Sequence, residues 1–263
     1  DEAAGNVELS EMSVWAKLQE FRAVHPAFVA LSFNSIVGFA GHGAIVHYAV
    51  SEESNISVTV GDLLLVDSGG QYLDGTTDIT RTVALGPPTA EQKRGYTAVL
   101  QGHLSLKRSQ FLEGTNGYQL DMLARAPLWQ AGLNYGHGTG HGVGAALCVH
   151  EGPFSVSPRK VMAPLCVGNV LSNEPGYYKA GAYGIRVENL VTVVEKEVTE
   201  SGRFLGFEDL TLCPYDRNLI ELQMLSKIER QQINAYHARV REELAPLLDG
   251  ADLEWLRQAT ADM

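Results

Sequence analysis

Short runs of apolar and β-branched residues, bounded by glycine or polar turns, predict the strands of this chain. The segment 63–66 is wholly apolar and is followed by Asp67 and a glycine turn at 68–70, which is typical of a buried strand. Alternating threonine and aliphatic positions predict a neighbouring strand. We therefore expect strands at residues 63–67, 76–85, 169–173, 183–194 and 204–212, and strands joined in a hairpin within residues 28–48.

Helical periodicity and capping residues predict helices near both ends and in the middle of the chain. Thr89 and Gln92, like Ser226 and Glu229, have the spacing of a capping box, in which each side chain binds the backbone N–H of the other residue. The stretch 135–144 is too rich in glycine to form a helix. The expected helices cover residues 8–22, 89–111, 116–131, 226–247 and 252–261.

The order of these elements predicts an α+β fold in a single domain, because no linker rich in proline, glycine or serine divides the chain. We expect residues 1–214 to form the main domain and residues 215–263 to form a helical extension that packs on it. The chain begins with Asp1 rather than Met or a signal peptide, so we expect a fragment or processed product of a longer protein.

Composition narrows the class of protein further. The chain has 20 Lys and Arg against 31 Asp and Glu, a formal net charge of -11, which argues against nucleic acid as the main partner. No run of about 18 apolar residues predicts a membrane-spanning helix. The three cysteines, Cys148, Cys166 and Cys213, form no CxxC pair, so we expect a reducing, cytoplasmic compartment rather than a disulfide framework.

Five side chains form a candidate metal-binding set: Asp67, Asp78, His141, Glu174 and Glu188. The acids lie next to or inside apolar strand segments, where an ionised carboxylate is costly to bury without a cation or hydrogen bonds. Taken singly, each acid also fits an ordinary turn or solvent-facing position. Together they suit Mn²⁺, Co²⁺, Zn²⁺ or Fe²⁺, and the excess of carboxylates favours Mn²⁺. Two ions about 3.5–4 Å apart, bridged by shared carboxylates, fit four acids better than one ion.

The motifs around these residues resemble the catalytic domain of the M24 metallopeptidases, which have the pita-bread fold. The similarity is strongest to the cytosolic-type Xaa-Pro aminopeptidases and extends from residue 7 to the end of the chain. It implies release of the N-terminal residue from peptides with proline at the second position, by a hydroxide that bridges two divalent ions. The segments that carry the resemblance are 43–48, 67–82, 137–144, 149–153, 172–178, 184–189 and the tail 208–248.

The resemblance also implies a division of the metal ligands. Asp67 would chelate one ion, Asp78 and Glu188 would bridge both, and His141 and Glu174 would complete the other site. All five ligand positions carry the residue type of the family. This retention argues against the pita-bread domains of histone chaperones, which have lost the ligands.

Three further histidines fall where the family places active-site imidazoles. We expect His150 to stabilise the carbonyl oxygen and the tetrahedral intermediate, and His47 to contact the scissile bond or move a proton. His137 would line the proline side of the pocket, and Glu174 would accept a proton during the attack. The remaining histidines fit surface or core positions: His25, His42, His103 and His237.

Arg186 and Thr80 are expected to support the ligands. Arg186 stands two residues before Glu188, so on one strand both side chains face the same side and an ion pair can orient this bridging carboxylate. Thr80 would hydrogen-bond a ligand in a similar way. For Tyr177 and Tyr178, the pattern leaves open whether they are pocket walls or core aromatics.

Three functions remain open at this point: an Xaa-Pro aminopeptidase, a prolidase-type enzyme that cleaves Xaa-Pro dipeptides, and a catalytically silent pita-bread module that binds peptides or proteins. Family members of the first type carry two amino-terminal domains and a first catalytic-domain helix before the point where this chain starts. The resemblance implies a homodimer for the full-length protein, and no membrane or nucleic-acid partner. His42 stands where relatives usually have a small polar residue, which would alter the substrate fit or add a metal contact.

Overall fold

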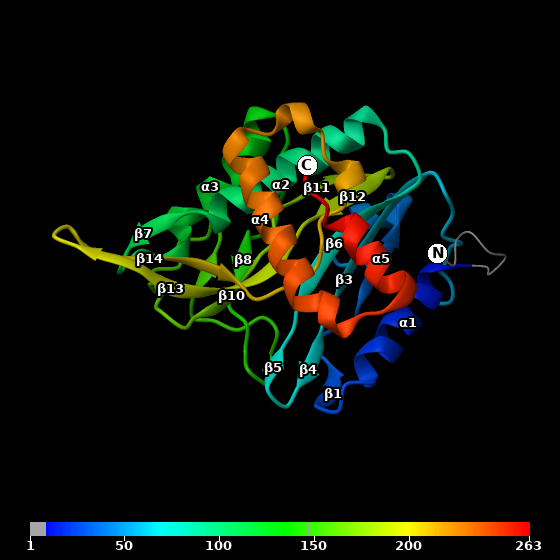
Figure 1. Cartoon of the computed structure of the whole chain (residues 1–263), viewed down its shortest axis with the longest axis horizontal. Coiled ribbons are helices and arrows are strands. Elements are labelled where there is room, and N and C mark those ends of the chain that lie inside the picture. The colour runs from blue at the N-terminus through cyan, green and yellow to red at the C-terminus, as the bar shows by residue number, and fades with distance from the viewer. Residues whose placement is uncertain (1–8, 147) are drawn as a thin grey trace.

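The structure, a computed structural model, describes residues 9–146 and 148–263, which form an α+β fold. Helices α2 and α3 lie together on one side of the molecule, and a long hairpin of β13 and β14 projects from the body (Figure 1). None of the described helices is long and apolar enough to cross a membrane. The α-helices are α1 (Glu11–Ala23), α2 (Ala90–Lys107), α3 (Gly117–Gln130), α4 (Lys227–Leu244) and α5 (Gly250–Ala259).

The strands of the described residues form small antiparallel sheets, arranged in the orders β1-β4-β5, β2-β3-β6, β10-β13-β14-β7, β11-β12 and β8-β9. Their bounds are β1 (Phe28–Leu31), β2 (Ile36–Phe39), β3 (Asp62–Ser68), β4 (Gly70–Tyr72), β5 (Gly75–Thr76), β6 (Ile79–Leu85), β7 (Gln110–Leu112), β8 (Gly140–His141), β9 (Ser155–Val156), β10 (Val170–Asn173), β11 (Gly176–Lys179), β12 (Tyr183–Arg186), β13 (Asn189–Thr199) and β14 (Gly202–Asp209).

The hairpin predicted within residues 28–48 is wrong. Strand β1 pairs with β4 and strand β2 pairs with β3, so the two strands belong to different sheets. The next residues form the 3₁₀ turn η2 (Ala40–Ala44) instead of a strand. A Cβ at Gly43 or Gly184 would collide with the backbone of the other residue, so the glycine-rich turn packs directly on β12.

Two predicted strands are interrupted at the residues that carry candidate ligands. The segment 76–85 splits into β5 and β6, with Asp78 in the gap, and the segment 183–194 splits into β12 and β13, with Glu188 in the gap. At the second break the chain leaves its pairing with β11 and joins β10 and β14. The N–H of Glu188 donates to the carbonyl oxygen of Thr80 at 3.1 Å, so this break also contacts β6 of the β2-β3-β6 sheet.

The helix predictions are confirmed with small shifts at the ends. The capping boxes of Thr89 with Gln92 and of Ser226 with Glu229 are both formed. Helix α2 ends at Lys107, earlier than predicted, because the following residues enter β7 and pair with β14. Helix α1 begins at Glu11 behind the cap Ser10, and the predicted start at residue 8 lies outside the described residues.

The main hydrophobic core contains side chains from strands β3 and β12, from α2 and from the C-terminal helices. Leu63, Tyr96 and Ile185 pack in the same cluster as Val240 and Leu256 of α4 and α5. The C-terminal helices therefore share the core that supports β3 and β12. A second cluster lies under the β10-β13-β14-β7 sheet and includes Leu106, Leu120, Leu171, Val191 and Phe207.

Candidate metal centre

The five predicted metal ligands converge on one cavity of about 460 Å³. Asp67 comes from β3, Asp78 and Glu188 from the two strand breaks, His141 from β8, and Glu174 from the residue after β10. The same cavity is lined by the other predicted site residues His47, His137, His150 and Arg186. Segments far apart in the sequence thus bring the candidate residues to one place.

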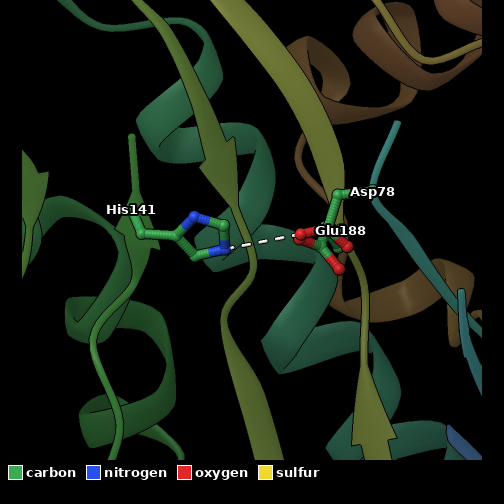
Figure 2. A group of neighbouring side chains, drawn as sticks. All are labelled: Asp78, His141 and Glu188. Carbon is green, nitrogen blue, oxygen red and sulfur yellow. Dashed lines mark ion pairs between the residues drawn. The ribbon is translucent and has the colours of Figure 1, made fainter. Parts of the chain in front are cut away.

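His141 faces the carboxylates from the opposite side of the cavity. Figure 2 shows its imidazole directed at Asp78 and Glu188, and the ligand atoms of these three residues lie within 4.8 Å of one another. The His141 Nε2 is 3.4 Å from the Asp78 Oδ2 and also 3.4 Å from the Glu174 Oε1. The imidazole is therefore placed between carboxylates that come from two different sheets.

Asp67 provides a direct test of whether a cation fits. Its Oδ2 accepts a hydrogen bond from Arg186 at 2.7 Å, but its buried Oδ1 has no hydrogen-bond partner among the described residues. A buried carboxylate oxygen without a donor is costly. A divalent cation with a preference for oxygen ligands would satisfy this atom, so the donor set fits a metal.

The ion pair of Arg186 differs from the one that strand alternation predicted. Its partner is Asp67, and its Nε reaches the Thr80 hydroxyl at 3.1 Å, which donates to the Glu188 Oε2 at 2.6 Å. The alternation rule does not extend to Glu188 because β12 ends at Arg186. Arg186 thus contacts one candidate ligand directly and reaches a second one through Thr80.

Protons compensate the clustered charge when no cation is present. Burial raises the pKa of Asp67 to about 6, although Arg186 acts in the opposite direction. Burial raises the pKa of Glu174 to about 7, and burial together with Asp78 holds the pKa of Glu188 well above its usual range. Burial lowers the pKa of His141, but the hydrogen bond that its ring donates to Asp78 and the charge of Glu174 outweigh it and raise this pKa to about 9. A site that retains protons in this way is one that cations would stabilise.

His137 and His150 have different surroundings. The His137 Nδ1 lies 2.7 Å from the Gly138 carbonyl oxygen and therefore donates to it, which leaves Nε2 to accept from the Tyr178 hydroxyl at 2.9 Å. Burial lowers the pKa of His137 to about 4, so the ring is neutral at pH 7 with both nitrogens engaged. The His150 ring stands edge-on to His141, with the ring centroids 4.2 Å apart, and burial lowers its pKa as well.

The contacts of His42 do not support the expected metal contact. Its Nδ1 lies 3.0 Å from the Glu11 Oε1, and its ring stacks on Tyr48 at 4.6 Å. Glu11 also accepts hydrogen bonds from the Phe39 N–H and the Tyr48 hydroxyl. His42 therefore ties α1 to the turn before His47 and binds Glu11 rather than a metal ligand.

The sequence pattern did not identify two polar residues at the site. The Ser172 hydroxyl donates to the Glu174 Oε1 at 3.2 Å and accepts the His141 N–H at 3.0 Å. Ser172 lies in β10, two residues before Glu174, so its closeness to this ligand along the chain was the signal that could have identified it. Tyr178 was left undecided, and its hydroxyl joins His137 to Arg186, which donates to it at 2.7 Å. The rest of the cavity wall is largely apolar and includes Phe33, Ile36, Val46 and Tyr48.

Comparisons with known proteins place these observations in a family. A family model for metallopeptidase family M24 matches residues 2–195, and a model for the C-terminal region of peptidase M24 matches residues 203–263. The chain therefore belongs to the M24 metallopeptidases.

Among individual proteins, the chain is 48% identical over 261 residues to aminopeptidase P2 of Arabidopsis thaliana, which covers 97% of this chain and 37% of the relative. It is 45% identical over 256 residues to Xaa-Pro aminopeptidase 1 of Dictyostelium discoideum, covering 94% of this chain and 40% of that protein. The chain thus spans well under half the length of these curated relatives.

Solved structures support the same family and show the pita-bread fold. The X-prolyl aminopeptidase of Caenorhabditis elegans, described as a cytosolic enzyme with a di-nuclear active site, superimposes with a TM-score of 0.95 at 38% identity and covers 100% of this chain and 44% of that one. The prolidase of Pyrococcus furiosus gives a TM-score of 0.67 at 26% identity, covering 80% of this chain and 58% of that one. The predicted α+β pita-bread fold is confirmed.

Proposed function

We propose that this chain is the catalytic part of a metal-dependent aminopeptidase that releases the N-terminal residue from peptides with proline at the second position. The observation that carries the proposal is the convergence of Asp67, Asp78, His141, Glu174 and Glu188 on one cavity. The identity of 45–48% to aminopeptidases P supports the substrate class. We propose the same activity and substrate class for the whole protein, of which this chain would be one part.

In this proposal the five ligands would hold two divalent ions, and Mn²⁺ would be the preferred metal because four of the five donors are carboxylates. When bound, the ions supply Lewis acidity and activate water at neutral pH. The unpartnered Oδ1 of Asp67 supports its assignment as a ligand. Arg186 and Thr80 orient Asp67 and Glu188 through the hydrogen bonds described above.

The histidines and Glu174 supply the remaining steps. Glu174 accepts the proton of the attacking water, and His150 stabilises the negative charge on the substrate carbonyl oxygen. His137, with both ring nitrogens engaged, forms a neutral wall for the proline ring. His47 lines the cavity and is the imidazole assigned to the scissile bond and to proton transfer. A donor is needed because the prolyl nitrogen has no N–H and leaves only when protonated.

We further propose that residues up to 214 form the catalytic domain and that residues 215–263 form an extension packed on it. The shared core of Leu63, Tyr96, Val240 and Leu256 supports this packing. The full-length protein is proposed to be a cytoplasmic homodimer without membrane or nucleic-acid partners. The net charge of -11 supports the exclusion of nucleic acid.

The decisive experiment compares two substrates with the full-length protein. An Xaa-Pro-Yaa tripeptide and the matching Xaa-Pro dipeptide are incubated with Mn²⁺, and each is repeated after chelation. We expect Mn²⁺-dependent release of the first residue from the tripeptide. Cleavage restricted to the dipeptide would favour the prolidase function, for which the similarity to solved prolidases is the supporting observation.

The third candidate, a silent module that binds peptides, predicts binding without turnover. Absence of hydrolysis of both peptides by the metal-loaded, full-length protein would contradict both enzymatic functions. The number of ions per chain gives an independent check, because fewer than two at saturation contradicts a shared-carboxylate site.

A further inference from the structure

A buried ion pair on α3 holds the glycine-rich segment that leads into the cavity. Asp121 and Arg125 are 4% and 5% exposed, and the Arg125 Nε donates to the Asp121 Oδ2 at 2.6 Å. The other guanidinium nitrogens of Arg125 donate to the carbonyl oxygens of Tyr135 at 2.8 Å and His137 at 2.7 Å. The guanidinium also lies 4.1 Å from the centre of the Tyr135 ring. One helix-borne side chain thus fixes three points of this segment.

Thr139 connects this ion pair to the candidate metal ligands. Its side chain is fully buried, and its hydroxyl donates to the Asp121 Oδ1 at 2.6 Å and accepts from the Tyr135 hydroxyl at 2.6 Å. Its backbone carbonyl oxygen accepts the N–H of Glu174 at 2.7 Å. Thr139 is also two residues before His141. A single residue therefore stands between α3 and two of the five ligands.

Local strand pairing is a weak constraint on these two ligands. His141 lies in β8, which has two residues, and Glu174 follows the four-residue β10. Strand β8 pairs with β9 over two residues, and Glu174 lies just beyond the four residues over which β10 pairs with β13. The 3.4 Å separation of the His141 Nε2 and the Glu174 Oε1 then also depends on side-chain contacts. Ser172 hydrogen-bonds both residues, and Thr139 connects them to α3.

We propose that Asp121, Arg125 and Thr139 are positioning residues that set the spacing of His141 and Glu174 and thereby the affinity for the metal ion that these two ligands would hold. This inference rests on the proposed dinuclear function. Among the described residues, these three form no hydrogen bond or ion pair with Asp67, Asp78 or Glu188, so the ion on that side should be affected much less.

The test removes the Thr139 hydroxyl while its shape is kept. Thr139→Val is compared with Thr139→Ser, which retains the hydroxyl, and with Asp121→Asn, which keeps the size but removes the charge. Thr97→Val is the matched control, because Thr97 is also fully buried and its hydroxyl accepts the Glu221 N–H at 2.8 Å on α2. Each variant of the full chain is titrated with Mn²⁺ by calorimetry and followed by electron paramagnetic resonance, which distinguishes coupled from isolated ions.

We expect Thr139→Val and Asp121→Asn to weaken one of the two Mn²⁺-binding steps by about 10–100-fold, the range for residues that orient metal ligands, and to leave the other step nearly unchanged. The coupled signal should be lost at metal concentrations at which the Ser variant and the Thr97→Val control retain it. Equal weakening of both steps, or a loss of thermal stability with both steps intact, would overturn the inference. If the unaltered protein does not bind two ions, the proposed function fails instead, so the two failures are distinguishable.

Discussion

The two sides of the metal centre are built in different ways. Asp67, Asp78 and Glu188 belong to a side formed around the β2-β3-β6 sheet, in which β3 and β6 are paired over seven residues and Arg186 and Thr80 cross-link the acids. His141 and Glu174 belong to a side formed by short strands and a glycine-rich segment. We refer to them as the sheet side and the loop side.

The difference shows that one site can be ordered by two physical means. On the sheet side, a continuous hydrogen-bonded register positions Asp67 opposite Ile36 and Thr80. On the loop side, the strand register is shorter, four residues between β10 and β13 and two between β8 and β9, and buried side chains of α3 add a further constraint. The following changes probe this contrast, from the largest expected effect to the smallest.

The largest effect is expected from Glu188→Gln on the sheet side. The change preserves shape but removes the charge of a proposed bridging ligand, so both ions should bind more weakly, by more than about 100-fold, which is the upper range for loss of a supporting residue. Metal content after dialysis and the kcat/KM for a tripeptide measure the effect. Glu208→Gln, at an exposed position of β14, is the control and should keep both ions. A Glu188→Gln protein with two tightly bound ions would show that this residue is not a bridge.

Arg186→Met should give the largest loss of stability. It leaves Asp67 buried without its ion-pair partner, and breaking a buried pair costs about 3–5 kcal/mol in free energy of unfolding. The loss should be smaller with Mn²⁺ present, because a cation can partly compensate Asp67. Urea denaturation with chelator and with Mn²⁺ measures both values. Arg203→Met is the comparison, since its ion pairs are 40% or more exposed and should contribute much less to stability. Equal losses in the two variants would contradict the importance of the buried pair.

His150→Ala tests the chemistry near the loop side. We expect kcat to fall by about 10²–10³-fold, the effect of removing one group that stabilises an oxyanion, while both metal ions remain bound. Steady-state kinetics and metal analysis on the same sample separate these effects. His25→Ala, outside the cavity lining, serves as the control. An unchanged kcat would exclude the proposed role of His150.

The smallest expected effect is a change with pH in how much Mn²⁺ stabilises the protein. It should involve ligands on both sides, because Asp67 and Glu174 both have raised pKa values. The raised pKa values, about 6 for Asp67 and about 7 for Glu174, mean that these two side chains hold more protons in the metal-free folded protein than in the unfolded chain, where acids have pKa values of about 4. Their contribution to stability should therefore fall as the pH rises from about 4 to about 7, whereas the lowered pKa of His137, about 4, acts with the opposite sign.

The raised pKa of His141, about 9, likewise lowers the stability of the metal-free protein as the pH rises above about 6.5. Bound cations replace these protons, so the increase in Tm caused by Mn²⁺ should grow from about pH 5 to about pH 8. Thermal denaturation across this range measures the trend. A metal-induced increase in Tm that is constant with pH would contradict the protonation of the cluster.

Local interactions explain why the helices and the ligand residue types could be predicted. The capping boxes at Thr89 and Ser226 join residues three positions apart, and such contacts are encoded by neighbouring residues. The candidate ligands could be chosen because acids within apolar segments need compensation wherever the chain folds. All of them line the same cavity, as does each of the three predicted histidines.

Long-range contacts explain what the pattern could not provide. The periodicity of residues 183–194 indicated one strand, but the Glu188 N–H binds the Thr80 carbonyl oxygen and the chain changes sheets at that residue. The pairing of Arg186 with Asp67 joins positions 119 residues apart, so alternation along one strand could not identify it. The same limit applies to the hairpin expected within residues 28–48, because strand partners depend on the whole sheet.

The amino-acid sequence by itself therefore determined the helices, the donor set and the family resemblance, since these depend on residue type and short spacing. Only the tertiary structure decided which residue supports which ligand: Arg186 holds Asp67, Thr80 holds Glu188, and Thr139 connects α3 to the loop side. The physical reason is that a hydrogen bond needs its partner within about 3 Å, and that distance is set by packing of distant segments rather than by separation along the chain.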